Sequence, residues 1–218
     1  MATIYADAED GYVIRTNQSS WSDARSNSVG TGYSDNLVSS STTVGAFRGA
    51  ARGGGYVWNV YRSFFFFDTS GISSDVTSAI FKLQGKTNGS GDLIAVKSTA
   101  GIETLGTSDF ISIVGWTPTG DNESNVTKYS DEITSWSTSA YNDITLNAQA
   151  LADIRDDDTL YICLLNFDYD LKDVDPVANT DNKNGFYFAN QYGTQHDPYI
   201  DYELAVVADN ATFFGANF

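Results

Sequence analysis

Four consecutive phenylalanines, residues 64–67 in the stretch YRSFFFFDTSGI, constrain the fold of this chain more than any other feature. Successive side chains of a β-strand point to opposite faces of a sheet, so a strand here places two rings on each face. A sheet with one wet face would leave two rings in water, and each would forgo about 2 kcal/mol of burial. We therefore expect a cover over the second pair, either a loop of the same chain (17–36 or 117–136) or a neighbouring subunit, and we favour the loop.

The rest of the chain has the composition of short strands and polar turns. Aromatic residues make up 14% and charged residues 18% of the chain, with 19 glycines and many Ser, Thr and Asn, which favours an all-β fold. A chain of 218 residues can bury a sizeable core as one domain. The expected strands are 2–7, 12–16, 36–40, 56–68, 77–85, 93–98, 110–116, 143–147, 159–167, 185–190 and 199–207.

One short helix is expected among these strands. Asn147 is a suitable N-cap, and Ala150, Leu151 and Ile154 follow at helical spacing. Many short strands with polar loops and a single helix indicate a β-sandwich or barrel of antiparallel sheets.

The charge of the chain excludes some partners. Twelve Lys and Arg against 28 Asp and Glu give a net charge of -16, which repels nucleic-acid backbones and anionic lipid. The excess acid indicates either a solvated surface or a protein that holds divalent cations or works in salty water. The start, MATIYADAED, lacks the basic and apolar regions of a secretory signal, and no apolar run approaches the ~20 residues of a membrane span. We expect synthesis in a cytoplasm and no membrane partner.

Few residues offer catalytic chemistry. His196 is the single histidine and lies in a turn, and Cys163 is the single cysteine and lies in an apolar run. Nucleophilic triads and His/Cys zinc sites are therefore nearly excluded. Carboxylates are plentiful enough for a glycosidase pair, but none are paired in a recognisable way. We predict a protein that is not an enzyme and requires no cofactor.

The densest group of oxygen ligands lies in residues 166–185. A calcium site there would use Asp168 and Asp170, because Ca²⁺ takes six to eight oxygens and an acidic loop can supply them. The alternative is a charged surface loop without a cation.

Two further groups of residues are candidates for binding. Sugar rings stack on aromatic faces, so Trp21, Trp116 and Trp136 are the glycan-binding candidates if they are exposed; the alternative is core or interface packing. Arg48 and Arg52, in a glycine-rich connection of an acidic protein, indicate either an anion or intersubunit contact or a solvated loop.

The segment from residue 61 to residue 85 resembles the opening half of the DNRLRE-type jelly-roll family. In that pattern an Arg precedes an apolar strand that ends in Phe-Asp-x-Ser, followed by a turn and a strand of the type Ile-x-Ser-Ala-x-Leu. The matching residues are Arg62, Phe67, Asp68, Ser70, Ile72, Ser78, Ala79 and Leu83.

The second half resembles a domain of predicted tailed-bacteriophage proteins. The segments SDFISIVGW, AYNDITLNAQALADI and GFYFANQYGTQHDPYIDYEL carry this resemblance, and the two resemblances together cover residues 55–208. They imply a jelly-roll β-sandwich of two antiparallel sheets, of the carbohydrate-binding-module type and without catalytic residues. They also place Phe65 and Phe67 in the core and turn Phe64 and Phe66 to the other face, where they are interface candidates.

The expected function is a non-enzymatic virion structural protein: a capsid decoration or cement protein, a head fibre or a tail component. Its partners would be the major capsid protein or further copies of itself, with host glycans as a further contact. Residues 1–208 would form the jelly-roll domain, and residues 209–218 an attachment arm with Phe213, Phe214 and Phe218 as interface residues. The alternatives are a free-standing carbohydrate-binding module or lectin, and a subunit of a non-viral extracellular filament.

Overall fold

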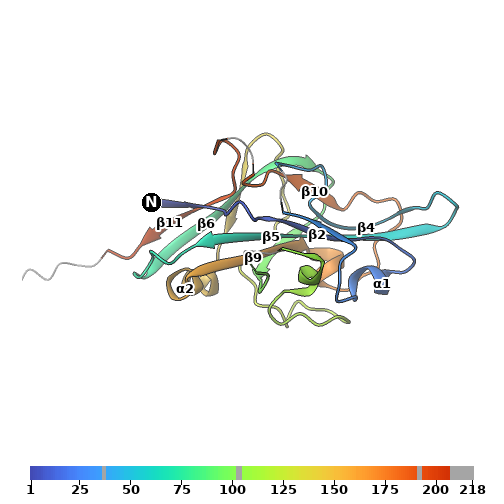
Figure 1. Ribbon diagram of the computed structural model, residues 1–218, viewed down its shortest axis with the longest axis horizontal. Helices are drawn as coiled ribbons and strands as arrows, with labels where there is room; N and C mark the ends of the chain where they lie inside the picture. The colour runs from blue at the N-terminus through green and yellow to red at the C-terminus, as the bar shows by residue number, and fades with distance from the viewer. Residues whose placement is uncertain (36–37, 102–104, 191–192, 207–218) are drawn as a thin grey trace, which may run out of the picture.

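The computed structural model describes residues 1–35, 38–101, 105–190 and 193–206. It is mostly β, with one large antiparallel sheet that does not close on itself. The body is elongated (Figure 1). The hairpin of β4 (Val44–Ala50) and β5 (Tyr56–Asp68) lies at one end of its long axis, and the end of β11 (Tyr199–Leu204) lies at the other. The predicted arm, with Phe213, Phe214 and Phe218, lies outside the described residues.

Eleven strands and four short helical segments make up the described fold. The strands are β1 (Ala2–Tyr5), β2 (Gly11–Gln18), β3 (Gly32–Ser34), β4 (Val44–Ala50), β5 (Tyr56–Asp68), β6 (Val76–Asn88), β7 (Leu93–Lys97), β8 (Tyr141–Thr145), β9 (Thr159–Asn166), β10 (Lys183–Phe186) and β11 (Tyr199–Leu204). The helices are α1 (Trp21–Arg25) and α2 (Ala148–Asp156), with a 3₁₀ turn η1 (Thr107–Ile111) and a π turn η2 (Phe167–Leu171).

Two long strands, β5 and β6, organise the sheet. β5 pairs with β2 along one edge, and along the other edge with β4 and then with β9, which in turn pairs with β7. β6 pairs with β11 and β10 along one edge and with β8 along the other. Because β10 also pairs with β4, it joins the β6 region of the sheet to the β5 region.

The first hydrophobic cluster confirms the inward pair of phenylalanines. Phe65 and Phe67 are fully buried, and their ring centroids lie 5.0 and 5.5 Å from that of Phe81 on β6, both in edge-to-face geometry. Such contacts add to the area burial of aromatic rings. This cluster lies between β5 and β6 and holds the two regions of the sheet together.

A second cluster buries the other pair, Phe64 and Phe66, which are also 0% exposed. The cover comes from the same chain: Trp21 of segment 17–36, Val126 of segment 117–136, and Phe110 of segment 110–116. The expectation of a covering loop is confirmed. Phe64 and Phe66 are therefore not available as subunit-interface residues, and that prediction is wrong.

The expected helix is present, but it is not alone. The side chain of Asn147 accepts hydrogen bonds from the backbone N–H groups of Gln149 and Ala150, which caps the start of α2 as predicted. The single-helix prediction missed α1, which is capped by Ser20. In the described part of the chain, no helix has the length and apolarity to cross a bilayer.

Residues 110–116, predicted as a strand, instead contain the end of η1 and a turn. Asp109 accepts hydrogen bonds from the backbone N–H of Gly106 and from the hydroxyl of Ser112, which fastens a helical turn. Gly115 then adopts a left-handed φ of 82°, which interrupts an extended strand. The predicted strand at 36–40 falls partly outside the described residues, and its Ser39 makes one isolated bridge to Tyr187.

Candidate functional site

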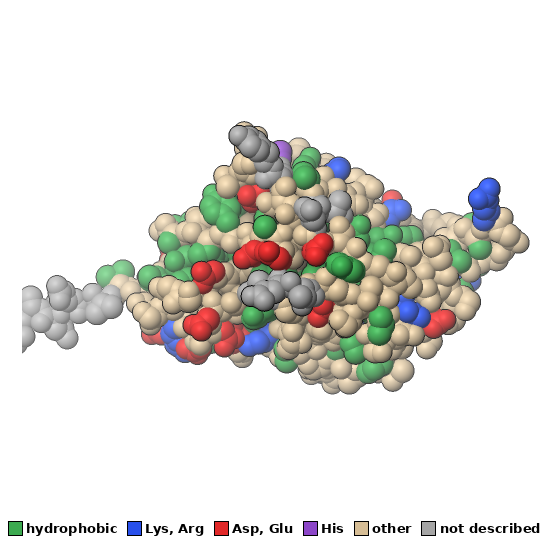
Figure 2. Space-filling model, in the orientation of Figure 1, with side chains coloured by type: hydrophobic (Ala, Val, Ile, Leu, Met, Phe, Trp, Pro, Cys, Tyr) green, Lys and Arg blue, Asp and Glu red, His purple; other side chains and the backbone are tan. Residues whose placement is uncertain are grey.

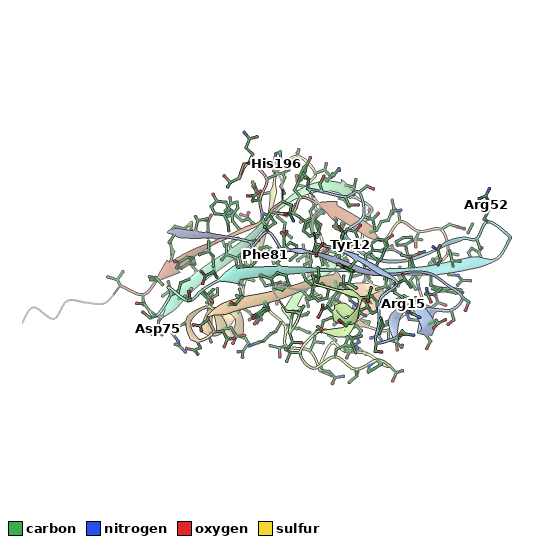
Figure 3. The ribbon with its side chains drawn as sticks, viewed as in Figure 1. Tyr12, Arg15, Arg52, Asp75, Phe81 and His196 are labelled. Carbon is green, nitrogen blue, oxygen red and sulfur yellow. The ribbon has the colours of Figure 1, made fainter. Side chains whose placement is uncertain are left out.

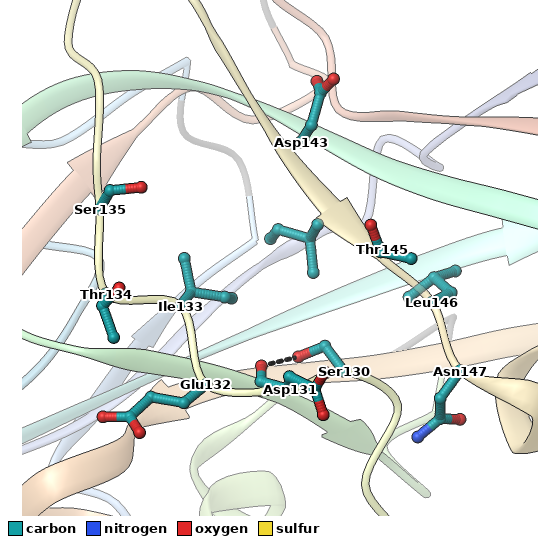
Figure 4. Close-up of a pocket in the computed structure, with 11 residues that line it drawn as sticks. Ser130, Asp131, Glu132, Ile133, Thr134, Ser135, Asp143, Thr145, Leu146 and Asn147 are labelled. Carbon is teal, nitrogen blue, oxygen red and sulfur yellow. Dashed lines mark hydrogen bonds between the residues drawn. The ribbon is translucent and has the colours of Figure 1, made fainter.

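A polar segment, residues 130–136, separates two shallow cavities and is the best-defined candidate for binding. The first cavity, of about 370 Å³, lies between this segment and residues 143–147 (Figure 4). The second, of about 440 Å³, is lined by Thr134, Ser135 and Trp136 and by residues 88 and 90–92. The linings are rich in hydroxyl, amide and carboxylate groups, which suit polar ligands more than apolar ones.

The segment is fastened along the edge of β7. Ile133 and Leu93 exchange backbone hydrogen bonds of 2.8 and 3.1 Å. The hydroxyl of Ser130 accepts a bond from the backbone N–H of Ala95, and the side-chain amide of Asn88 donates to the backbone oxygen of Trp136 at 2.8 Å. The cavity walls are thus held by backbone contacts rather than by loop packing alone.

Three carboxylates from separate segments meet beside the second cavity, and we call Asp92, Glu132 and Asp168 the acid trio. One carboxylate oxygen from each lies within 4.8 Å of the others. Figure 4 shows the side chain of Glu132 pointing away from Leu146, which lines the opposite side of the first cavity. Partial burial, followed by the nearby charge of Asp92, raises the pKa of Glu132 and of Asp168. Lys172 lies 3.9 Å from Asp168 and offsets part of the repulsion.

Within the described part of the chain, the acid trio is the group of three carboxylates close enough to hold a hard cation. Ca²⁺ takes oxygen ligands at 2.3–2.6 Å, roughly six to eight of them, so the trio would supply part of a coordination sphere and solvent or a ligand the remainder. The predicted calcium ligand Asp168 belongs to this group, while Asp92 and Glu132 were missed. They lie far from residue 168 in the sequence, and nothing local indicates that the three meet.

The other predicted calcium ligand, Asp170, has a different partner, and that part of the prediction is wrong. Its two carboxylate oxygens accept hydrogen bonds from Nε and Nη2 of Arg62 at 2.8 and 2.7 Å, and both side chains are fully buried. Arg25, also buried, donates to the backbone oxygen of Asp170 at 2.6 Å and lies 3.3 Å from Asp173. This buried ion network joins α1, β5 and η2.

Two of the three tryptophans, Trp21 and Trp136, are buried and are not the exposed platforms that glycan stacking requires. Trp21 is 9% exposed and donates from Nε1 to Asp173 at 2.9 Å, and the half-buried ring of Trp116 lies 4.0 Å from the guanidinium carbon of Arg62. Trp136, also 9% exposed, packs against Phe186. The prediction of exposed rings is wrong for Trp21 and Trp136, although Trp136 still borders the second cavity, while Trp116 is half-buried.

Arg48 and Arg52 of the glycine-rich connection do not form one site, because they lie in different places. Arg48 lies over the rings of Tyr56 and Trp58, at 4.5 and 4.9 Å, and 3.7 Å from Asp175. Arg52 projects from the tip of the β4–β5 hairpin, at the far end of the molecule from Asp75 (Figure 3). On the face shown in Figure 2, basic side chains are scattered rather than gathered into a patch.

The single cysteine and the single histidine of the chain both pack against other side chains. Cys163 is fully buried in the second cluster, and burial raises the pKa of its thiol. His196 stacks on Tyr187, with ring centroids 4.6 Å apart.

One buried acid was not identified from the sequence. Asp10 is 0% exposed and accepts two contacts of 3.1 Å from the backbone N–H of Ala189. Burial, together with the charge of Asp197, raises its pKa well above the ordinary value.

No family model matches this sequence, and no curated protein matches it significantly.

Proposed function

We propose that this chain is a non-enzymatic structural protein of a tailed-phage virion, folded as a jelly-roll β-sandwich. Its place would be that of a capsid decoration or cement protein, a head fibre or a tail component. The sequence resemblance over residues 55–208 and the acidic composition support this role. A jelly roll is supported by the first cluster, which packs the β6 region against the β5 region as two layers would.

The observation that carries the proposal is an exposed apolar end of the molecule. Met1, Tyr5, Leu204 and Val206 are 77%, 48%, 43% and 93% exposed. Met1, Leu204 and Val206 gather where β1 begins and β11 ends, because Ala2 pairs with Tyr202 in the sheet. Tyr5 lies at the other end of the four-residue strand β1, opposite Tyr199. Exposed apolar groups that gather at one place favour contact with another protein surface. A virion subunit needs such an attachment surface, while an isolated soluble enzyme does not.

Mass spectrometry of purified particles tests this proposal. We expect the chain at high copy number in particles purified by two density gradients, in a fixed ratio to the major capsid protein. Recovery of the chain only in the soluble fraction of the lysate would refute a virion role. Recovery in filaments without capsid protein would instead identify the subunit of an extracellular filament.

A carbohydrate-binding module is the second candidate function, and the second cavity favours it. Trp136 borders this cavity together with Asn88, Ser90 and Ser135, and Asp92 of the acid trio lies in the same lining. Hydroxyl, amide and carboxylate groups beside an aromatic edge can bind sugar hydroxyls. A glycan array with the wild type and Ser135→Ala tests this function, with Ser139→Ala as control. Binding that only Ser135→Ala weakens supports it; an array without signal excludes it.

A further inference from the structure

β1 offers an open strand edge at the exposed apolar end. Among the described residues, β1 pairs with β11 on one side, and no strand pairs with its other side. The backbone N–H of Ala6 donates to the oxygen of Pro198, and Ala2 and Ile4 follow at two-residue spacing in the same register. Because an antiparallel ladder alternates, the backbone groups of Thr3 and Tyr5 face the open side.

This edge lacks the features by which proteins usually block strand addition. Such features are a lysine, a proline, a bulge or a covering loop. The sequence of β1 is ATIY, which contains no charge and no proline. By contrast, the edge of β7 is covered by residues 128–133 through the bridges Leu93–Ile133 and Val96–Lys128. β1 is therefore open to a further strand from Ala2 to Tyr5. Two residues past Tyr5, the backbone N–H of Asp7 donates to the oxygen of Phe66, so β5 marks the limit of this open edge.

The chain itself contains a segment suited to this edge. Residues 207–218, VADNATFFGANF, follow directly after Val206, at the same end of the sheet as Met1. Residues 210–218 contain no charged side chain although the chain carries a net charge of -16, so they can approach β1 of another copy without repulsion. Twelve extended residues reach roughly 40 Å, three times what the four residues of β1 require.

We propose that residues 207–218 of one copy add as an antiparallel strand to the open edge of β1 in a second copy. The backbone groups of Thr3 and Tyr5 would bond to the added strand, and Tyr5 and Met1 would contact its phenylalanines. Main-chain bonds give such strand addition its affinity, and side-chain pockets give its specificity. The inference deepens the attachment role of this end and rests on it.

Geometry favours a second copy over the chain's own β1. An antiparallel strand on the open edge must begin opposite Tyr5 and end opposite Ala2. β11 runs in this direction, so the following residues leave at the Ala2 end. To pair with their own β1 they would first have to run back along the whole strand, whereas a second copy can approach from the other end.

Analytical ultracentrifugation of the purified full-length chain tests the inference. We expect concentration-dependent association of the wild type, lost on deletion of residues 207–218. Thr3→Pro removes an outward N–H and should weaken association at least tenfold. Thr3→Val is the matched control: it loses the same hydroxyl, which bonds to Asp201, but keeps the N–H, and should associate as the wild type does. Circular dichroism checks that each variant is folded.

Two further measurements keep the inference falsifiable if Thr3→Pro fails to fold. Phe213→Ser with Phe214→Ser should abolish association, and a synthetic peptide of residues 207–218 should bind the truncated chain. A wild type that stays monomeric, association that survives the deletion, or a peptide that does not bind would each overturn the inference. These measurements use purified protein, so their failure would leave incorporation into virions as a separate result.

Discussion

Arg62 and Asp170 form a bidentate ion pair that is fully buried, although 107 residues separate them in the chain. Their charges have been removed from water, so each depends on the other for compensation. Arg62 also donates to the backbone oxygen of Phe110 at 2.6 Å, and its guanidinium carbon lies 4.2 Å from that ring. The pair thereby fixes the 3₁₀ turn over the second hydrophobic cluster.

Removing one member of this pair should strongly destabilise the protein. We expect Asp170→Asn or Arg62→Met to lower the free energy of unfolding by about 3–5 kcal/mol, because the remaining charge stays buried without compensation. Urea denaturation measures the change. Asp143→Asn, which breaks the exposed pair with Lys82, is the control and should cost about 1 kcal/mol or less. If the buried and the exposed variants lost similar amounts of unfolding free energy, the stabilising role of the buried pair would be contradicted.

Phe66→Ala should reduce stability without changing self-association. The side chain is fully buried, and its ring meets that of Tyr161 edge-to-face at 5.8 Å. Loss of a buried phenylalanine costs about 3–5 kcal/mol. Thermal unfolding and sedimentation measure the two effects, with Tyr161→Phe as a control that keeps the ring contact. Weaker association of a variant with wild-type stability would instead place Phe66 at an interface.

Neutralising one carboxylate of the acid trio should stabilise the protein at pH 7 in EDTA. The pKa of Glu132 is raised by partial burial and by Asp92, so its charged form is disfavoured in the folded state. Protonated Glu132 therefore adds to the free energy of unfolding at low pH, and this contribution is lost as the pH rises through the raised pKa. Glu132→Gln should therefore raise the melting temperature at pH 7, whereas Asp131→Asn, outside the trio, should not.

Calcium should act on the same three carboxylates. A cation between them relieves their repulsion, so we expect Ca²⁺ to raise the melting temperature of the wild type and to raise that of Glu132→Gln much less. Equal shifts in wild type, Glu132→Gln and Asp131→Asn would show that Ca²⁺ acts elsewhere on the acidic surface. Differential scanning fluorimetry with Ca²⁺ and with EDTA provides the comparison.

Because Asp10 is buried, we expect the free energy of unfolding to depend on pH at values above the ordinary pKa of a carboxyl group. Its folded-state pKa is raised, mainly by burial and then by the charges of Asp197, Asp7 and Glu9. The folded state thus binds the proton more tightly, and stability falls as the pH rises through the raised pKa, by up to about 1.4 kcal/mol per pH unit. Urea denaturation should show that the free energy of unfolding falls less between pH 4 and pH 8 for Asp10→Asn than for the wild type. Parallel curves for the two proteins would contradict the shift.

Local sequence signals predicted the parts of the fold that depend on local chemistry. The cap at Asn147 and the spacing of Ala150 and Ile154 define α2, and the alternation of four phenylalanines requires two covered faces. The strand predicted at 110–116 was wrong because its apolar residues suit a strand, while Asp109 and Ser112 stabilise a helical turn through side-chain bonds. Apolar spacing did not distinguish these two possibilities.

The candidate site was harder to predict because it depends on contacts between distant segments. Asp168 and Asp170 are two residues apart, yet η2 directs Asp170 to Arg62 in the interior and leaves Asp168 beside Asp92 and Glu132. The acidic run indicated available oxygens, but the sequence could not show which of them an arginine had already bound. The burial of Trp21 and Trp136 was missed for the same reason, since their contacts with Asp173 and Phe186 come from remote parts of the chain.

The position of β5 in the chain has a consequence for synthesis. Its Phe64 pairs in the sheet with Cys163 of β9, so a ribosome must add roughly 100 further residues before that partner exists. At about 5–20 residues per second this takes roughly 5–20 s. During that interval four adjacent phenylalanines are present without much of their final cover. The nascent chain should therefore be a substrate for chaperones of the cell that synthesises it. The yield of folded protein should depend on the supply of these chaperones, even if the finished protein is stable.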